Sequence, residues 1–169
     1  AVTHVILEEY HVKRQVPYFM DYVKRYTDCP FLVRLNTENG KLVPGRMVRA
    51  NEMAQYKDIT NGDWKFLNFD SRTGKIVVPK GSMGHRWDDK QGNWNLKYED
   101  TVTNNEYDPE LSFFAKNEGI QQVEFIEYGL DKKTNRGVPV RYLSLANGEK
   151  VAVATIYDLT LAQYGVSRG

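Results

Sequence analysis

The sequence predicts an α+β fold: a largely antiparallel, β-rich block with helices at the N- and C-terminal ends. Three observations lead to this prediction. Apolar residues recur at helical spacing near the N-terminus, apolar and polar residues alternate along later segments, and two Asn-Gly pairs mark tight hairpin turns. With 169 residues, the chain is long enough for one domain with a sizeable apolar core.

A helical segment is expected from Thr3 to about Thr27. Its first part has an apolar stripe, which ends near Pro17 because proline cannot continue a helix. A second, aromatic-rich helix is expected over residues 18–26, and Pro30 ends it. The stripe consists of Val5, Leu7, Tyr10 and Val12.

Seven segments have the composition and alternation typical of β-strands. The Asn-Gly pair at 39–40 should join the first two as a hairpin, and the pair at 147–148 should join the last two. Pro44 has no N–H to donate, so the second strand is expected at a sheet edge or on a bulge. Between residues 79 and 122 no clear element is predicted. The expected strands are 31–36, 42–49, 64–69, 75–78, 122–128, 138–145 and 150–156.

At the end of the chain, Asp158 is expected to cap a short helix from Leu159 to Tyr164, which Gly165 ends. The chain opens on a helical pattern with neither a Met nor a cap and stops shortly after this helix, so we interpret it as an internal piece of a larger protein. The expected organisation is a helical segment at 1–30, a β-rich block at 31–156, and a short helix with a cut end at 157–169.

Composition excludes several function classes. A net charge of +1 argues against a dedicated nucleic-acid binder, which needs clustered excess positive charge. No apolar run approaches the roughly 18 residues that cross a bilayer, and there is no signal-peptide pattern, so a soluble domain without direct membrane insertion is expected. Cys29 is the only cysteine, which excludes an intrachain disulfide, a thiolate zinc site or a self-contained iron–sulfur cluster.

One set of residues has metal-ligand spacing. His4, Glu8 and His11 stand at i, i+4 and i+7, so a regular helix would place them on one face, and two imidazoles with a carboxylate can hold zinc. No downstream residues supply the outer hydrogen-bonding shell that such sites need. A polar helix face, solvated or covered by missing chain, is therefore the favoured interpretation.

The remaining chemical motifs are weak. The carboxylate pairs at 88–89 and 99–100 are interpreted as solvated loop charge, because general acid–base catalysis needs carboxylates that converge across a cleft. The segment 81–84 lacks a phosphate-loop pattern. Trp87 and Trp94 lie beside basic residues and suit either a platform for stacking a base or an anchor that ties an irregular loop to the core; the anchor is favoured.

Several long segments, in order along the chain, resemble the catalytic α subunit of membrane-bound respiratory nitrate reductases. The most similar are 3–11, 21–33, 81–87, 92–96 and 156–169, the last reading Ile-Tyr-Asp-Leu-Thr-Leu-Ala-Gln-Tyr-Gly-Val-Ser-Arg-Gly. Because these matches keep the family's order, the resemblance covers essentially the whole chain. It is much more specific than a single short motif.

The resemblance implies a parent enzyme of the dimethyl sulfoxide reductase superfamily. Its α subunit carries molybdenum between two molybdopterin guanine dinucleotides and one 4Fe-4S cluster, and it reduces nitrate to nitrite. Electrons from quinol arrive through a haem-containing membrane subunit and an iron–sulfur β subunit, at the cytoplasmic face of the plasma membrane. The same resemblance relates residues 1–30 to the end of a pterin-binding α/β layer and the block 31–156 to a β-rich insertion.

The family's cofactor ligands have no counterpart here. Neither the His and Cys ligands of the cluster nor the Asp ligand of molybdenum matches a residue of this chain, so no catalytic residue or metal ligand is assigned and the isolated chain is expected to be inactive and without cofactor. Tyr22, Arg25 and Tyr26 are candidates for proximity to cofactor-binding layers, although packing is the favoured role for all three.

Two alternatives to nitrate reductase remain open at this point. One is the same block of a related molybdenum enzyme, such as a selenate, chlorate or perchlorate reductase or a hydrocarbon dehydrogenase. The other is a non-enzymatic binding module, for which the tryptophan segment is the only support.

The large side chains of the N-terminal segment lie on more than one helix face, so they cannot all find partners within the β block. We expect the segment to pack on the remainder of the α subunit in the parent protein, and in isolation to fray or to pair with a second copy. The residues concerned are Val5, Tyr10, Phe19, Tyr22 and Val23.

Overall fold

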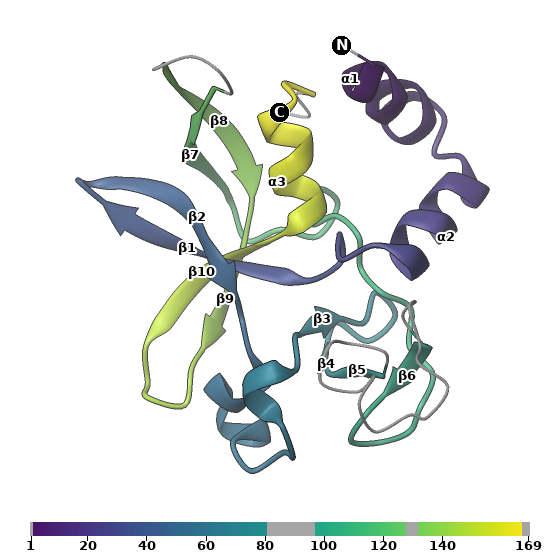
Figure 1. The fold of residues 1–169 in the computed structure, drawn as a ribbon, viewed down its shortest axis with the longest axis vertical. Coiled ribbons are helices and arrows are strands. Elements are labelled where there is room, and N and C mark those ends of the chain that lie inside the picture. The colour runs from purple at the N-terminus through teal and green to yellow at the C-terminus, as the bar shows by residue number, and fades with distance from the viewer. Residues whose placement is uncertain (1, 81–96, 128–131, 167–169) are drawn as a thin grey trace.

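The fold was obtained as a computed structural model, which describes residues 2–80, 97–127 and 132–166. The N-terminal helices are α1 (Val2–Leu7), a π-helical continuation η1 (Glu8–Lys13) and α2 (Pro17–Tyr26). The β block then leads to α3 (Ile156–Gln163) near the other end of the chain (Figure 1). Three short 3₁₀ turns lie in the middle: η2 (Ala50–Glu52), η3 (Ala54–Tyr56) and η4 (Gly62–Trp64).

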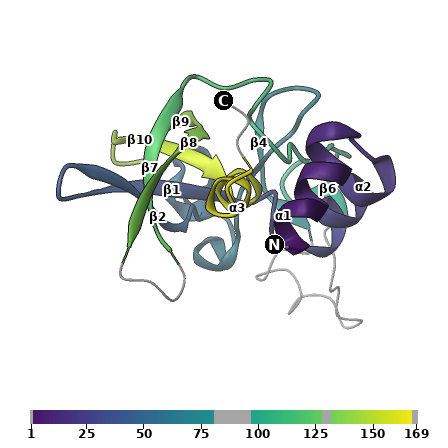
Figure 2. The ribbon, with the colours of Figure 1, turned by 90° about the horizontal axis from the view of Figure 1, so that it is seen from above.

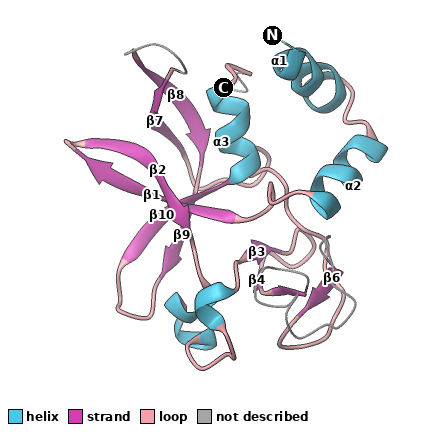
Figure 3. Cartoon of the chain, in the orientation of Figure 1, coloured by secondary structure: helices cyan, strands magenta, loops and turns pink. Residues whose placement is uncertain are grey.

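Six strands form the main sheet, in the order β8-β7-β2-β1-β10-β9. Their pairings are antiparallel except for a parallel contact between β2 and β7 at Leu42 and Val123, which confirms the predicted α+β class with a largely antiparallel sheet. These strands are β1 (Leu32–Glu38), β2 (Lys41–Met47), β7 (Ile120–Ile126), β8 (Lys133–Pro139), β9 (Arg141–Ser144) and β10 (Lys150–Thr155). Two small ladders lie beside the sheet (Figure 3), β3 (Asn68–Phe69) with β4 (Ile76–Val77) and β5 (Pro79–Lys80) with β6 (Lys97–Asp100).

Both predicted Asn-Gly hairpins are confirmed. Asn39 and Gly40 have φ values of 51° and 76° between β1 and β2, as a two-residue type I′ turn requires. Gly148 has a φ of 82° in the turn between β9 and β10. The left-handed backbone that these turns need is accessible to Asn and Gly at low steric cost.

Pro44 lies on a bulge. The register between β1 and β2 shifts where Val33 pairs with Met47 and Leu35 pairs with Pro44. Because β2 has neighbours on both sides in the sheet, the bulge is the correct one of the two predicted alternatives and the edge position is wrong. Gly45 permits the close approach here, since a Cβ at that position would stand 2.8 Å from the carbonyl oxygen of Arg34.

The strand predicted at 138–145 is divided in two. β8 pairs with β7, and β9 pairs with β10, so two strands separated only by Val140 occupy opposite ends of the sheet order. The sheet therefore curls until its two edges meet at Val140, whose N–H donates to the carbonyl oxygen of Gly119. The apolar alternation continues across this bend, which is why periodicity alone could not locate it.

Other boundaries also needed correction. The strand predicted at 64–69 shortens to Asn68–Phe69, because Gly62–Trp64 forms the 3₁₀ turn η4. The strand predicted at 75–78 shortens to Ile76–Val77. The prediction of no clear element between 79 and 122 is wrong, since β5, β6 and the start of β7 lie within it.

The cap of α3 is Thr155 rather than the predicted Asp158. The Thr155 hydroxyl accepts a hydrogen bond from the N–H of Asp158 at 3.0 Å, so the helix begins at Ile156, three residues earlier than predicted. Asp158 is itself buried, and its carboxylate accepts hydrogen bonds from the Ser112 hydroxyl at 2.6 Å and from the N–H of Phe113 at 2.8 Å. The sequence therefore predicted the N-cap about one helical turn too far along the chain.

Both faces of the sheet are covered by apolar side chains. α3 packs on one face, against a cluster formed by Val33, Leu35, Val123, Phe125, Val138, Val140, Ala154, Leu159 and Ala162. The middle of the chain covers the other face, with Leu32, Val48, Met53, Leu67, Phe69, Phe113, Leu143 and Val153 in its core. α3 lies between the sheet and the N-terminal helices (Figure 2), where Tyr157 and Leu161 contact Leu7 and Val23.

The N-terminal helical segment breaks as predicted. Pro17 occupies the first turn of α2, and Gln15 just before it has a φ of 50°. None of the helices within the described ranges has the length and apolarity to cross a bilayer.

Candidate functional site

The molecule has two candidate functional regions. One is the outer surface of α2, the helix that holds the candidates Tyr22, Arg25 and Tyr26, and the other is an open groove beside β9. On α2, Tyr18, Tyr22 and Tyr26 follow one another at helical spacing, with ring centroids 6.5 Å and 5.1 Å apart. Their exposed fractions are 80%, 50% and 54%. The two tyrosine candidates are therefore neighbours on an exposed face.

Arg25 points elsewhere. Its guanidinium lies over the ring of Tyr98, 4.4 Å from the centroid, and its terminal nitrogen is 3.7 Å from the Asp21 carboxylate. The Tyr98 hydroxyl donates to the same carboxylate at 3.2 Å. Burial, with the Asp21 charge beside it, raises the pKa of Tyr98 well above its ordinary value. Arg25 thus ties α2 to β6, and the structure does not bring the three candidates together.

His4, Glu8 and His11 do not share one helix face, so these three residues form neither the favoured polar face nor the alternative zinc site. His4 lies near Glu8, with 3.3 Å between Nε2 and the carboxylate, and its Nδ1 is 2.8 Å from the carbonyl oxygen of Tyr164. His11 is buried on another side, 2.9 Å from the sulfur of Met20 and edge-on to the ring of Tyr157. The π-helical turn at η1 changes the angular spacing, so residues at i, i+4 and i+7 no longer share one face.

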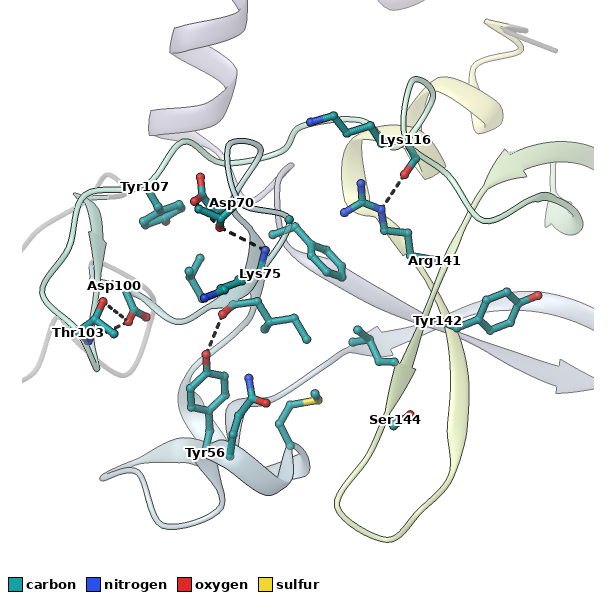
Figure 4. Close-up of a pocket in the computed structure, with 18 of the residues that line it drawn as sticks. Tyr56, Asp70, Lys75, Asp100, Thr103, Tyr107, Lys116, Arg141, Tyr142 and Ser144 are labelled. Atoms are coloured by element: carbon teal, nitrogen blue, oxygen red, sulfur yellow. Dashed lines mark hydrogen bonds between the residues drawn. The ribbon is translucent and has the colours of Figure 1, made fainter.

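The groove has a volume of about 1220 Å³ and opens to solvent. β9 forms one side, the loop before β4 forms another, and the turn after β6 closes the end (Figure 4). Its surface mixes apolar groups such as Ile76 with charged ones such as Lys75 and Glu106. The groove is therefore wide and mixed in character rather than a closed, apolar ligand pocket.

Two carboxylates at the groove hold turns. Asp70 accepts hydrogen bonds from the Thr73 hydroxyl at 2.7 Å and from the N–H of Asp108 at 3.0 Å. Burial opposes its ionisation, but these hydrogen bonds outweigh burial and lower the pKa of Asp70 below its ordinary value. Asp100 accepts from the N–H of Val78 and from Thr103. The carboxylate oxygens of Asp70 and Asp100 therefore stabilise the backbone of these two turns.

The prediction of solvated loop charge at 99–100 is half correct. Glu99 is half-exposed and pairs with Lys80 at 3.0 Å. Asp100 is buried, because its turn folds under the ladder of β5 and β6. The pair at 88–89, the segment 81–84, Trp87 and Trp94 lie outside the described residues.

A buried ion pair lies at the inner wall of the groove. Arg141 contacts both carboxylate oxygens of Glu110 at 3.0 Å, and it donates from Nε to the carbonyl oxygen of Lys116 at 2.7 Å. Its guanidinium also stacks on Phe69 and Phe113, at 4.7 and 4.8 Å from the ring centroids. Burial raises the pKa of Glu110, and the charge of Arg141 opposes that effect.

Sequence reasoning missed this pair, since nothing in the local pattern of either residue points to a partner 31 positions away. Within the described residues there is no group of three or more His, Cys, Asp or Glu side chains placed to hold a metal ion. Cys29 is half-buried, and burial raises the pKa of its thiol. The buried charged groups Asp70, Asp100, Glu110 and Arg141 all make contacts within the chain.

Comparison with known proteins gives the family context. No family model matches the chain. The chain is 39% identical to the respiratory nitrate reductase 1 alpha chain of Escherichia coli K12 over 181 residues, and 37% identical to the nitrate reductase alpha chain of Bacillus subtilis 168 over 171 residues. It is 38% identical to the nitrate reductase alpha subunit of Mycobacterium tuberculosis H37Rv over 178 residues.

These alignments take in essentially all of this chain, 99% to 100%, but only 13% to 14% of each relative. The chain therefore spans about one seventh of the length of these curated relatives. Along its whole length it is similar to one continuous segment of nitrate reductase alpha chains.

Proposed function

We propose that this chain is a structural segment of the catalytic α subunit of a molybdenum-containing respiratory nitrate reductase, the subunit that reduces nitrate to nitrite with electrons from quinol. The observation that carries the proposal is the match of the entire chain to nitrate reductase alpha chains from distantly related bacteria. These names favour nitrate over the other substrates considered for this enzyme branch.

The segment's own contribution is architectural. Its buried charges, such as Arg141 and Asp158, are engaged with residues of the chain itself. Within the part of the chain that the structure describes, the imidazole and thiol donors His4, His11 and Cys29 do not converge. The parent's molybdenum bis(molybdopterin guanine dinucleotide) and 4Fe-4S cluster do not fit this donor set, so other segments of the parent would hold them.

The partners follow from the same proposal. They are the remainder of the α subunit, an iron–sulfur β subunit and a haem-containing membrane subunit, with the assembled enzyme at the cytoplasmic face of the plasma membrane. The organisation into residues 1–30, 31–156 and 157–169 also remains part of the proposal. In it, the first unit is the end of a pterin-binding α/β layer and the second is a β-rich insertion.

A chimera tests the proposal. This chain would replace the matching 181-residue alignment region in the Escherichia coli nitrate reductase 1 alpha chain, and the assembled enzyme would be assayed for nitrate reduction and for molybdenum and iron content. We expect an enzyme with full metal content that reduces nitrate. The control is the same chimera with Val153→Asp, which puts a charge into a fully buried position and should prevent assembly.

Two outcomes of this experiment would contradict the proposal. A chimera that accumulates to the normal level but reduces no nitrate would show that the segment does not belong in this subunit. So would a chimera that accumulates and holds neither metal.

A further inference from the structure

α2 departs in part from an ordinary surface helix: Val23 packs inward, but three tyrosines occupy the exposed side together with Asp21. On such a helix the charged residues face water and the aromatic residues face the core. Here Tyr18, Tyr22 and Tyr26 are 80%, 50% and 54% exposed, whereas the side chain of Lys24 is only 18% exposed. The three tyrosines form what we call the tyrosine stripe.

Inward contacts set this orientation. The ammonium of Lys24 lies 2.7 Å from the Asp108 carboxylate, and Arg25 stacks on Tyr98. Val23 is buried beside them in the cluster formed with α3. Rotating the tyrosine stripe toward the core would break all of these contacts, so the stripe stays on the outside while this fold persists.

α1 and η1, which precede α2, also expose large apolar side chains. Val2, Val5, Ile6 and Tyr10 are 74%, 54%, 40% and 43% exposed, while Leu7 is buried against α3. The N-terminal helices therefore have apolar side chains on two sides, and only one side is covered. An exposed aromatic ring leaves much of its roughly 150–250 Å² of surface in water, and a run of such rings marks an interaction surface.

We infer that the tyrosine stripe docks on another segment of the same polypeptide. The inference rests on the proposed function. The chain matches its relatives along its whole length but covers only about 14% of theirs. We therefore take the rest of the same polypeptide as the partner of the stripe. The rings would pack on apolar side chains, and the hydroxyls would donate to carbonyl or carboxylate oxygens.

The charge pattern disfavours a lipid surface as the occupant. Helices that lie in a membrane interface carry Lys and Arg on the polar face next to the apolar one, where they meet anionic headgroups. On α2 the two cations of the last turn, Lys24 and Arg25, turn inward to Asp108 and Tyr98. The stripe is thus uncharged where a lipid-binding helix would be basic.

Hydroxyl-radical footprinting of the nitrate-reducing chimera tests the inference. For each residue, the labelling rate in urea-unfolded protein is divided by the rate in the folded protein to give a protection factor. Trp64 on η4 is the internal reference, because it is 52% exposed and lies on a different part of the fold. We expect protection factors for Tyr22 and Tyr26 several times that of Trp64.

A pair of variants separates docking from folding. Tyr22→Lys and Trp64→Lys change residues of nearly equal exposure, 50% and 52%, so neither should unfold the segment itself. Tyr22→Lys should lower the yield and melting temperature of the assembled chimera, and Trp64→Lys should leave both unchanged.

Three results would overturn the inference. The first is an active, metal-loaded chimera in which the stripe is labelled as fast as Trp64, which leaves the proposed function intact. The second is equal protection in the isolated chain together with a dimer mass, which identifies a second copy as the occupant. The third is a chimera that accumulates to the normal level but reduces no nitrate, which removes the proposed function as well.

Discussion

Arg141 joins distant parts of the chain through buried contacts. It joins β9 to the loop before β7 through Glu110 and the carbonyl of Lys116, and it covers two phenylalanine rings of the core. An ion pair that deep gains Coulomb energy but loses the hydration of two charges. Its net contribution to stability is small, whereas the loss of one partner leaves a buried charge alone.

We therefore predict that Arg141→Met lowers the free energy of unfolding by about 3–5 kcal/mol. The double variant Arg141→Met with Glu110→Leu should recover much of this loss, since it leaves no buried charge unpaired. Urea unfolding of both variants is the measurement. A single variant within about 1 kcal/mol of the parent, or a double variant that is worse than the single one, would contradict this account of the pair.

At the scale of elements, local backbone chemistry was readable from the sequence and long-range pairing was not. Asn39-Gly40 determines a hairpin because its residues tolerate left-handed backbone, and Pro17 divides the helical segment because its ring blocks continuation. The bend at Val140 and the burial of Asp100 depend on which strands meet across the sheet. No window of neighbouring residues contains that information.

The candidate site residues show the same difference between local features, which the sequence predicts, and long-range contacts, which it does not. The helix expected over residues 18–26 is present as α2, and its spacing, a local property, brings Tyr22 and Tyr26 next to each other. Arg25 is directed to Tyr98, a residue far along the chain, and His11 turned away when the helix widened at η1. Glu110 was missed altogether.

The N-cap of α3, which is Thr155 and not the predicted Asp158, can be tested directly. Thr155→Ala removes the hydroxyl that accepts from the N–H of Asp158 and should cost about 1 kcal/mol of stability. Thr155→Ser keeps the acceptor and is the matched control. Thermal unfolding followed by circular dichroism is the measurement. An alanine variant as stable as the serine variant would mean that the helix does not depend on this cap.

Three carboxylates in separate parts of the molecule respond to acid in the same direction. Burial opposes the ionisation of Glu52, but hydrogen bonds from Arg46 and from the N–H of Arg49 lower its pKa. The hydrogen bonds already described lower the pKa of Asp70. Hydrogen bonds from Lys133 and Lys41 lower the pKa of Glu124.

A carboxyl group whose pKa is lower in the folded state stabilises the fold above its unfolded pKa, roughly 3.9 for Asp and 4.3 for Glu. That contribution is lost as pH falls through the lower, folded pKa. Glu110 works in the opposite sense: burial raises its pKa, so its protonation as pH falls favours the folded state. At the surface of η1, hydrogen bonds from Lys13 and Arg14 lower the pKa of Glu9 as well. With four groups against one, stability should hold from neutral pH to about 4.5 and fall below it.

The melting temperature measured from pH 7 to pH 3 at constant ionic strength tests this prediction, and one double variant isolates a single contribution. Lys41→Met with Lys133→Met removes both cations beside Glu124, which lie 2.5 and 2.8 Å from its oxygens. Its melting temperature should change less between pH 4.5 and pH 3 than that of the parent chain, because Glu124 then titrates nearer its ordinary pKa. A parent chain that gains stability through this range would show that Glu110 outweighs the four carboxylates whose pKa is lowered. An unchanged acid response in the double variant would remove Glu124 from the explanation.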